Sequence, residues 1–147
     1  MTPPIDALVP HARPALLLDR VVEARGDVVV TETLIREDNP YCLDGRVGAW
    51  IGIELIAQSI AAMAGLEAVA AGRPVRIGFL LGTRRYRSNV PWFALGDLLR
   101  VEVSREFQTD DGLGAARGRI VASDGRVLGE GLLTVYQPAR PEDVIGR

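Results

Sequence analysis

Glu54 and Gln58 are two polar residues near the start of a strongly apolar segment, and they are the first candidates for chemistry in this chain. Isoleucine and leucine surround Glu54, so a helix through this segment would place its carboxyl group against an apolar wall. Burial disfavours the charged form of a carboxyl group, which suits a side chain that must exchange a proton near neutral pH. Gln58, four residues on, would share the same helix face and could orient that carboxyl group by a hydrogen bond. The alternative is that both side chains bond only to the backbone of a neighbouring sheet or loop.

His11, the one histidine of the chain, is a candidate acid or base. It precedes the first predicted strand, and an imidazole is the side chain that ordinarily titrates near neutrality. A lone histidine can equally be structural or exposed, so both interpretations stay open. With Cys42 as the one cysteine, the chain has too few soft ligands for a typical transition-metal site, and we expect neither a metal nor a bound cofactor.

Gly48 and Gly52 stand where the apolar helix should begin. The N-terminus of a helix exposes backbone N–H groups at the positive end of its dipole, so this segment could hold an oxyanion. The alternative is that these glycines only let the chain turn.

Arg84, Arg85 and Arg87 form the densest positive cluster of the chain. Side chains alternate along a strand, so Arg85 and Arg87 should share one face and Arg84 the other. Such a cluster suits an anionic partner or a phosphate group. It could instead be a solvated strand edge that its charge protects from aggregation.

The elements that must position these side chains are one long helix and six strands. The helix is expected over residues 50–71, because that segment lacks proline, is dense in alanine, leucine and isoleucine, and is followed by Gly72 and Pro74. A loop is expected over residues 37–48. Strands are expected at residues 16–23, 28–36, 75–87, 98–108, 113–123 and 127–137. This order predicts an α+β fold in which one curved antiparallel sheet encloses the helix.

The chain of 147 residues, 48% apolar and 24% charged, has the composition of one soluble globular domain. We expect that domain over residues 1–138 and a C-terminal tail over 139–147. The net charge of −2 offers no basic field for nucleic acid. Residues 51–71 have the length of a membrane span, but Glu54, Gln58 and Glu67 favour a buried helix with Glu67 at the surface near its end. Without a signal-peptide pattern, the protein is expected in the cytoplasm.

Several stretches resemble the signature motifs of hot-dog-fold 3-hydroxyacyl-[acyl-carrier-protein] dehydratases. They are Val-Pro-His at residues 9–11, Arg-Pro-Ala-Leu-Leu-Leu-Asp-Arg-Val at 13–21 and Gly-Ile-Glu-Leu-Ile-Ala-Gln-Ser at 52–59. Within that superfamily, residues 50–54, 78–86 and 135–138 resemble the dehydratase-like proteins of aryl polyene biosynthesis. The resemblance covers nearly the whole chain. It implies a sheet wrapped round a central helix, a dimer with two active sites at the subunit interface, and Glu54 as the acidic catalytic residue.

The chain departs from this family at one important point. The better-known dehydratases carry a catalytic histidine in a Gly-His-Phe-Pro stretch ahead of the helix, whereas residues 44–48 here read Asp-Gly-Arg-Val-Gly. His11 matches a different position, in the family's Leu-Pro-His-Arg-x-Pro stretch. Either His11 has taken over proton transfer, or the elimination runs mainly on Glu54, or the chain is a catalytically degenerate subunit of an active dehydratase.

The resemblance implies dehydration of a 3-hydroxyacyl thioester, carried on the phosphopantetheine arm of an acyl carrier protein, to the trans-2-enoyl product. Glu54 would protonate the departing hydroxyl group and His11 would remove the α-proton. Gly48 and Gly52 would supply backbone donors for the enolate-like oxygen. Phe79 and the helix would line the site for the acyl chain, and the three arginines would attract the carrier protein or the phosphate of its arm. The alternative activity is an acyl thioesterase, and the dimer partner is a second copy or another hot-dog subunit.

Overall fold

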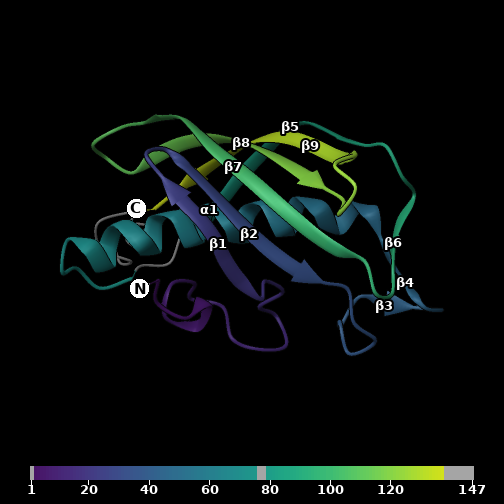
Figure 1. Cartoon of the computed structure of the whole chain (residues 1–147). Helices are drawn as coiled ribbons and strands as arrows, with labels where there is room; N and C mark the ends of the chain where they lie inside the picture. Colours follow the sequence, from purple (N-terminus) through teal and green to yellow (C-terminus); the bar gives the residue numbers. More distant parts are fainter. Residues whose placement is uncertain (1, 76–78, 138–147) are drawn as a thin grey trace.

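One long helix lies against a six-stranded antiparallel sheet that curls over one side of it (Figure 1). The computed structural model describes residues 2–75 and 79–137, and for residues 79–81 and 84 it describes the backbone and not the side chains. In sheet order the strands are β1 (Arg20–Arg25), β2 (Val28–Leu34), β7 (Leu98–Gln108), β8 (Leu113–Val121), β9 (Val127–Tyr136) and β5 (Phe79–Ser88). The predicted α+β fold, a curved antiparallel sheet around a central helix, is confirmed.

Helix α1 (Gly52–Ala70) follows one turn of 3₁₀ helix, η2 (Ala49–Ile51), so the predicted helix at residues 50–71 is confirmed to within two residues at each end. It ends because Gly72 adopts a φ of 68°, which lets the N–H of Arg73 bond to the carbonyl oxygen of Ala68 at 2.8 Å. By length and composition, residues 49–70 could cross a membrane, but 61% of that window is buried inside the protein. This segment is the core helix of the fold.

The core fills the space between the helix and the sheet. Leu55 and Ile56 of α1 are fully buried, and Ile56 packs where a side chain at Gly118 of β8 would otherwise stand. Leu99 and Val101 point inward from β7, alternating with exposed residues as the sequence predicts for a strand with one covered face. Burial of each such side chain stabilises the fold by about 1.5–3 kcal/mol. The rigid helix that results carries the candidate carboxylate.

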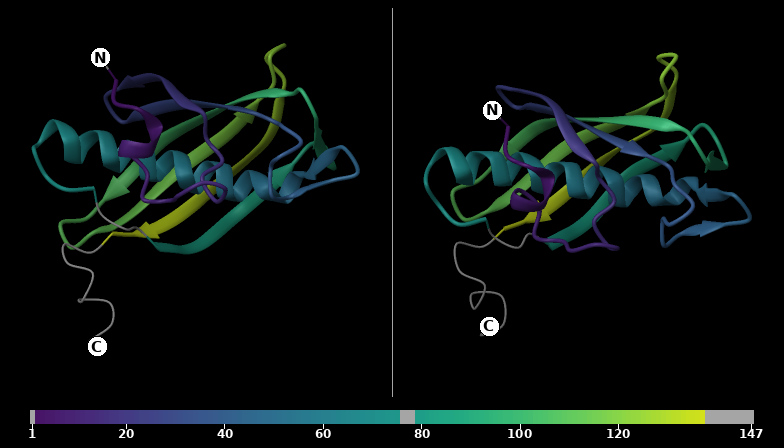
Figure 2. Two further views of the ribbon diagram at one scale, coloured as in Figure 1. Left: turned by 90° about the horizontal axis from the view of Figure 1, so that it is seen from below. Right: turned by 60° about the horizontal axis from the view of Figure 1, so that its bottom comes forward.

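A second, small sheet was not predicted from the sequence. Strands β3 (Cys42–Leu43), β4 (Arg46–Gly48) and β6 (Trp92–Ala94) form it beside the N-terminal end of α1 (Figure 2). The loop expected over residues 37–48 is therefore wrong in part. The strands have only two or three residues each, too few for a periodic pattern, and β4 pairs with β6 from a distant part of the chain.

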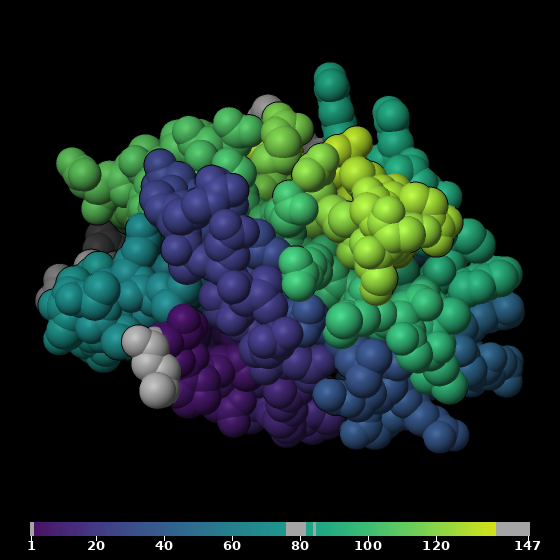
Figure 3. Space-filling model, in the orientation of Figure 1, coloured from purple at the N-terminus to yellow at the C-terminus, as the bar shows by residue number. Residues whose placement is uncertain are grey.

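The N-terminal segment crosses the face of the helix that the sheet leaves uncovered (Figure 2). It contains a 3₁₀ turn, η1 (Ile5–Ala7), and in the space-filling view it packs beneath the hairpin of β1 and β2 (Figure 3). The carbonyl oxygen of Leu8 lies where a Cβ at Gly65 would stand, so only glycine lets the two backbones meet there. This contact fixes the N-terminal segment along the helix, and His11 follows Leu8 by three residues.

Candidate active site

Glu54 lies in the first turn of α1, and Gln58 lies one turn further along the same face. The amide of Gln58 is fully buried, and its Nε2 atom donates to Oε1 of Glu54 at 3.0 Å and to the carbonyl oxygen of Ala15 at 2.8 Å. Its Oε1 atom accepts the backbone N–H of Leu17 at 2.8 Å. Gln58 therefore makes both kinds of bond considered from the sequence, to the carboxylate and to the backbone of a neighbouring segment. It fixes the carboxylate and the N-terminal segment relative to each other.

His11 comes from the loop after η1 and faces the same carboxylate. Its Nε2 atom lies 3.6 Å from Oε1 of Glu54, and its Nδ1 atom is buried without a hydrogen-bond partner among the described residues. A separation of 3.6 Å is too long for a direct hydrogen bond. The guanidinium of Arg13 steadies the loop by donating to the carbonyl oxygens of Leu16 and Leu18, each at 2.9 Å. Two groups that can transfer protons therefore lie side by side, nearly in van der Waals contact.

Glu54 is not enclosed in an apolar wall, as the sequence suggested. Its side chain is 36% exposed and that of His11 is 35% exposed. The neighbouring Ile51 and Leu55 are buried as predicted, but Glu54 points to the side of the helix that only the N-terminal segment covers. One face of the pair is thus open to a ligand or to another protein.

Gly48 and Gly52 have structural partners at the start of the helix. Gly48 pairs with Trp92 in the small sheet, and the N–H of Gly52 donates to the carbonyl oxygen of Ala49. A Cβ at Gly52 would stand 2.1 Å from the hydroxyl oxygen of Tyr86, so this glycine makes room for that side chain. The oxyanion role of both glycines stays a prediction. For Gly52, the backbone N–H would have to leave the carbonyl oxygen of Ala49 before it could donate to an oxyanion.

Tyr86 of β5 is a site-supporting residue that the sequence analysis did not single out. Its hydroxyl group donates to the carbonyl oxygen of Ala49 at 2.6 Å, which ties the edge of the sheet to the start of the helix. Burial raises the pKa of Tyr86 above its ordinary value, against an opposing hydrogen bond with Ser88. Gly129 and Gly131 of β9 flank the same side chain. A tyrosine between arginines in a strand gave no signal of this contact, because its partner is a backbone carbonyl.

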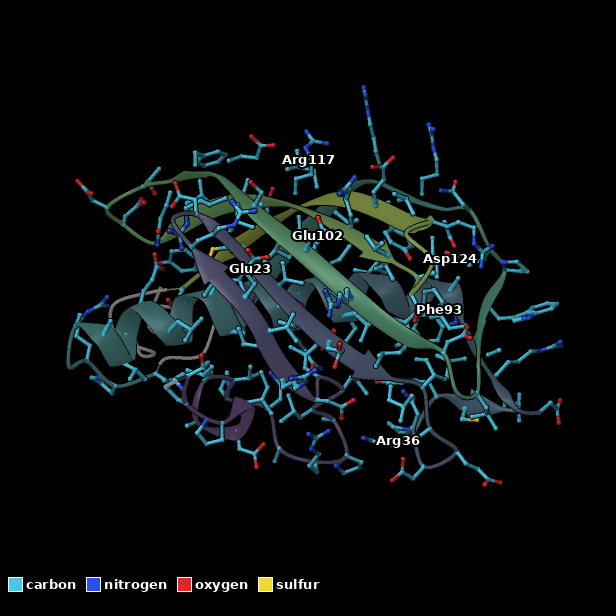
Figure 4. The ribbon with its side chains drawn as sticks, in the orientation of Figure 1. Glu23, Arg36, Phe93, Glu102, Arg117 and Asp124 are labelled. Atoms are coloured by element: carbon cyan, nitrogen blue, oxygen red, sulfur yellow. The ribbon has the colours of Figure 1, made fainter. Side chains whose placement is uncertain are left out.

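Arg85 and Arg87 do share one face of β5, as predicted. With Arg117, Glu130 and Leu132 they line a cavity of about 320 Å³ on the exposed face of the sheet. Figure 4 shows the side chain of Arg117 pointing away from the helix. Glu54 and His11 lie on the other side of the sheet, beyond the helix, so the structure does not bring the arginines together with the carboxylate. The side chains of Phe79 and Arg84 lie outside the described residues, and their predicted roles stay predictions.

Glu67, expected at the surface, lies near the end of α1 and binds the guanidinium of Arg105 through both carboxylate oxygens, at 2.6 and 2.7 Å. Its side chain is 44% exposed, so that expectation is confirmed. In the described ranges of the chain, no group of three His, Cys, Asp or Glu side chains is arranged to hold a metal ion. Among the residues that the structure describes, the carboxylate of Glu54 and the imidazole of His11 beside it form an arrangement that can exchange protons.

A curved antiparallel sheet wrapped round one central helix defines a protein of the hot-dog class. The chain belongs to the ApeP-like dehydratase family, whose model, described as ApeP dehydratase, matches residues 3–146. It is similar to the solved structure of the dehydratase heterocomplex ApeI:P from Xenorhabdus doucetiae, with a TM-score of 0.93 and 29% identity. That match covers 99% of this chain and 97% of the other. The predicted resemblance to hot-dog dehydratases of the aryl polyene type is confirmed.

More distant solved structures share the fold alone. A hypothetical thioesterase protein with coenzyme A from Streptococcus pneumoniae TIGR4 has a TM-score of 0.61 at 15% identity, covering 80% of this chain and 86% of that one. The protein smu.793 from Streptococcus mutans UA159, bound to acetyl CoA, has a TM-score of 0.63 at 13% identity, covering 86% and 92%. No curated protein sequence matches the chain significantly.

Proposed function

We propose that this chain is a subunit of a dehydratase that converts 3-hydroxyacyl thioesters, carried on the phosphopantetheine arm of an acyl carrier protein, to trans-2-enoyl thioesters. The observation that carries the proposal is the gap of 3.6 Å between Nε2 of His11 and Oε1 of Glu54. In a member of a dehydratase family, an imidazole and a carboxyl group that lie side by side can supply the base and the acid to neighbouring atoms of one substrate, as an elimination of water needs.

The proposed step breaks the Cα–H and Cβ–O bonds of the substrate and forms the double bond between these carbons. Neutral His11 accepts the α-proton, and protonated Glu54 donates its proton to the departing hydroxyl group, which leaves as water. The reaction ends with imidazolium and carboxylate facing each other across the gap, and transfer of one proton between them restores the starting state. Each proton-transfer group contributes about 10²- to 10⁴-fold to the rate.

Gln58 holds the carboxyl group for this step. Its Nε2 atom donates to Oε1 of Glu54, and its other bonds are to the buried backbone of Ala15 and Leu17, so the amide cannot turn freely. A held carboxyl group loses less orientational freedom when the substrate binds. The elimination is neutral in redox terms and uses only acid and base groups, so the proposal includes no cofactor beyond the substrate's own phosphopantetheine arm.

We propose further that a second hot-dog subunit covers the pair in the active complex. About a third of each side chain, Glu54 and His11, is exposed in the single chain, although an elimination proceeds best where water is excluded. The relative from Xenorhabdus doucetiae is a heterocomplex by its name, which supports a different subunit as the partner. The proposed setting is the cytoplasm, where carrier-bound acyl chains are built.

One observation favours a second candidate function, that of a non-catalytic subunit of an active dehydratase. Residues 44–48 lack the histidine of the better-known dehydratases, and Arg46 and Gly48 of that stretch are used in the small sheet instead. A chain that only completes the interface of an active partner would tolerate this change. In that case the substitution of His11 or Glu54 would leave the dehydration rate of the complex unchanged.

The test supplies a 3-hydroxyacyl carrier protein to the purified chain, alone and together with the hot-dog subunit with which it assembles. Mass spectrometry of the acyl group follows loss of water, and a thiol reagent follows release of the free arm. We expect loss of water without thiol release. Thiol release from a saturated acyl carrier protein would indicate a thioesterase and contradict the proposal.

A further inference from the structure

Strand β5 lies at one edge of the six-stranded sheet, and among the described strands only β9 pairs with it. A row of its backbone N–H and C=O groups therefore faces outward. An edge of this kind can accept a strand of another chain, which continues the sheet from one subunit into the next. What that edge accepts depends on the side chains it presents.

Charges of alternating sign run across the exposed face of the sheet and end at this edge. Glu102 of β7 lies opposite Arg119 of β8, and the two form an ion pair of 2.9 Å. Arg119 lies opposite Glu130 of β9, and Glu130 lies opposite Arg87 of β5. Opposite charges on neighbouring strands attract, and like charges directly opposite each other repel. The next strand beyond Arg87 would continue the alternation with an acidic residue.

Arg85 and Arg87 also differ from the other arginines of the exposed face in having no carboxylate of their own. In the described part of the chain, Arg100 pairs with Glu32 and Arg117 pairs with Glu106, whereas neither Arg85 nor Arg87 makes an ion pair. Both side chains are exposed, and side chains in the colour of β5 project from the top of the molecule in Figure 3. A bulge between residues 84 and 87 places Arg85 at a φ of 58°, which brings it to the same cavity as Arg87.

We infer that Arg85 and Arg87 select the partner subunit: the β5 edge accepts an acidic strand of a different hot-dog subunit and rejects a second copy of this chain. Antiparallel pairing of two copies around this half of β5 would place arginines of both copies on one stretch of edge, where their charges repel. A strand bearing carboxylates would pair with them instead. The inference rests on the second hot-dog subunit of the proposed function and names the charge of its docking strand.

An apolar surface next to this edge supplies contact area for such a partner. Tyr41, Trp50 and Trp92 are 42%, 62% and 45% exposed, and they come from the turn before β3, from η2 and from β6. Tyr41 and Trp50 are in edge contact, with ring centroids 5.6 Å apart. Strand β6, which holds Trp92, follows β5 after three residues. Arg46 stacks on Trp92 at 4.0 Å and adds another positive charge. Aromatic residues and arginine are the side chains that most often anchor protein interfaces.

The acyl carrier protein is the other acidic partner that these arginines could attract. The position of the arginines favours the subunit, because they sit at a free strand edge and on the side of the sheet away from Glu54 and His11. A carrier protein docked there would have to pass its arm around the sheet to reach the pair. Measurements of self-association and of carrier-protein binding separate the two partners.

The first experiment measures self-association of the purified chain by sedimentation velocity, for the wild type and for Arg85→Gln/Arg87→Gln. Loss of the like charges should tighten self-association at least tenfold. For the wild type, raising the salt concentration should also tighten it, because salt screens repulsion between exposed charges. The double variant Arg25→Gln/Arg73→Gln is the matched control. Both residues are exposed and lie outside β5, and this variant loses two positive charges, as Arg85→Gln/Arg87→Gln does. Equal self-association of all three proteins would overturn the inference.

The second experiment mixes the wild type with Arg85→Glu/Arg87→Glu, each with a different tag. We expect a mixed dimer that forms in preference to either homodimer, because the variant presents carboxylates to the arginines of the wild type. If the arginines only protected the edge from aggregation, no mixed dimer would form, and the inference would fail. It would also fail if the charge reversal abolished binding of an acyl carrier protein and left association between chains unchanged. Neither experiment depends on loss of water, so failure here is distinct from failure of the proposed dehydration.

Discussion

The imidazole of His11 and the carboxylate of Glu54 face each other across 3.6 Å, although one comes from the N-terminal loop and the other from the central helix. The helix is fixed by its packing against the sheet, and the loop is fixed by backbone contacts with Gly65 and Gln58. The pair is therefore assembled by two separate anchoring points on one helix. Each anchor can be removed independently, which makes the arrangement open to test.

Replacement of His11 should slow dehydration without unfolding the protein. In His11→Gln the side chain keeps hydrogen-bonding atoms but cannot accept a proton, so we expect the rate to fall about 10²-fold or more. The side chain is about a third exposed, so stability in urea should change little. Loss of water from a 3-hydroxyacyl carrier protein measures the rate. An unchanged rate would contradict the role of His11 and would mean that Glu54, or a histidine of the partner subunit, removes the α-proton.

Replacement of Gln58 should weaken both the fold and the site. In Gln58→Leu the backbone N–H of Leu17 and carbonyl oxygen of Ala15 lose their partner in a buried place, at about 1–3 kcal/mol for each unsatisfied group. Urea unfolding measures this loss, and Gln108→Leu, on an exposed strand position, is the control that should lose far less. Equal stability of the two variants would show that the buried amide does not hold the N-terminal segment.

Much of the fold follows from sequence patterns that the structure confirms. Residues 99–104 alternate between apolar and polar, and the apolar ones, Leu99, Val101 and Val103, are buried. Phe107 lies beyond a register shift and is exposed. The apolar segment that ends at Gly72 is the central helix, because burial on the sheet side requires apolar residues along its length. Glu54 and Gln58, four residues apart, share a face and a hydrogen bond as expected.

The small sheet and the position of His11 could not be predicted from sequence patterns, because both depend on contacts between distant segments. Strands β4 and β6 have three residues each, so their pairing has no periodic signature. The approach of His11 to Glu54 depends on two backbone groups that bind Gln58, which no residue type marks, and on Gly65, whose backbone partner a single helical glycine does not reveal. The sequence also predicted that Glu54 would be buried, and that prediction was wrong. A helix that is apolar on all sides does not reveal which of its sides the sheet covers.

A methyl group at Gly65 should displace the segment that carries His11. In Gly65→Ala the new Cβ would stand 2.1 Å from the carbonyl oxygen of Leu8, so the segment must move. We expect a loss of about 1–3 kcal/mol in the free energy of unfolding and a lower dehydration rate, although Gly65 lies three turns from Glu54. Thermal unfolding and the loss-of-water assay measure the two effects. Gly82→Ala, with open space around it, is the control, and equal effects of both changes would contradict this role.

Removal of the Tyr86 hydroxyl group should loosen the start of the helix. Tyr86→Phe loses the bond to the carbonyl oxygen of Ala49, which is worth about 0.5–1.5 kcal/mol at neutral pH. Because burial raises the pKa of Tyr86, the folded state keeps the phenolic proton at a pH where the unfolded state has lost it. The stability that this proton contributes is complete below the ordinary pKa of tyrosine and is lost as pH rises through the raised pKa.

Urea unfolding of the wild type and Tyr86→Phe across alkaline pH measures this effect. We expect the wild type to be the more stable at neutral pH and its advantage to shrink as the solution becomes more alkaline. A constant difference between the two proteins at every pH would mean that the pKa of Tyr86 is the same in the folded and unfolded states, which would contradict this account.

Glu54→Gln tests the proposed role of the carboxyl group most directly, because glutamine has nearly the same shape and cannot donate the proton. The rate of water loss from a 3-hydroxyacyl carrier protein should be measured for the wild type, for Glu54→Gln and for Glu67→Gln, each in the presence of the second hot-dog subunit. We expect Glu54→Gln to be slower by about 10²-fold or more, and Glu67→Gln, which disturbs only a surface contact with Arg105, to keep the wild-type rate. A Glu54→Gln protein that is correctly folded and turns over substrate at the wild-type rate would contradict the proposed mechanism.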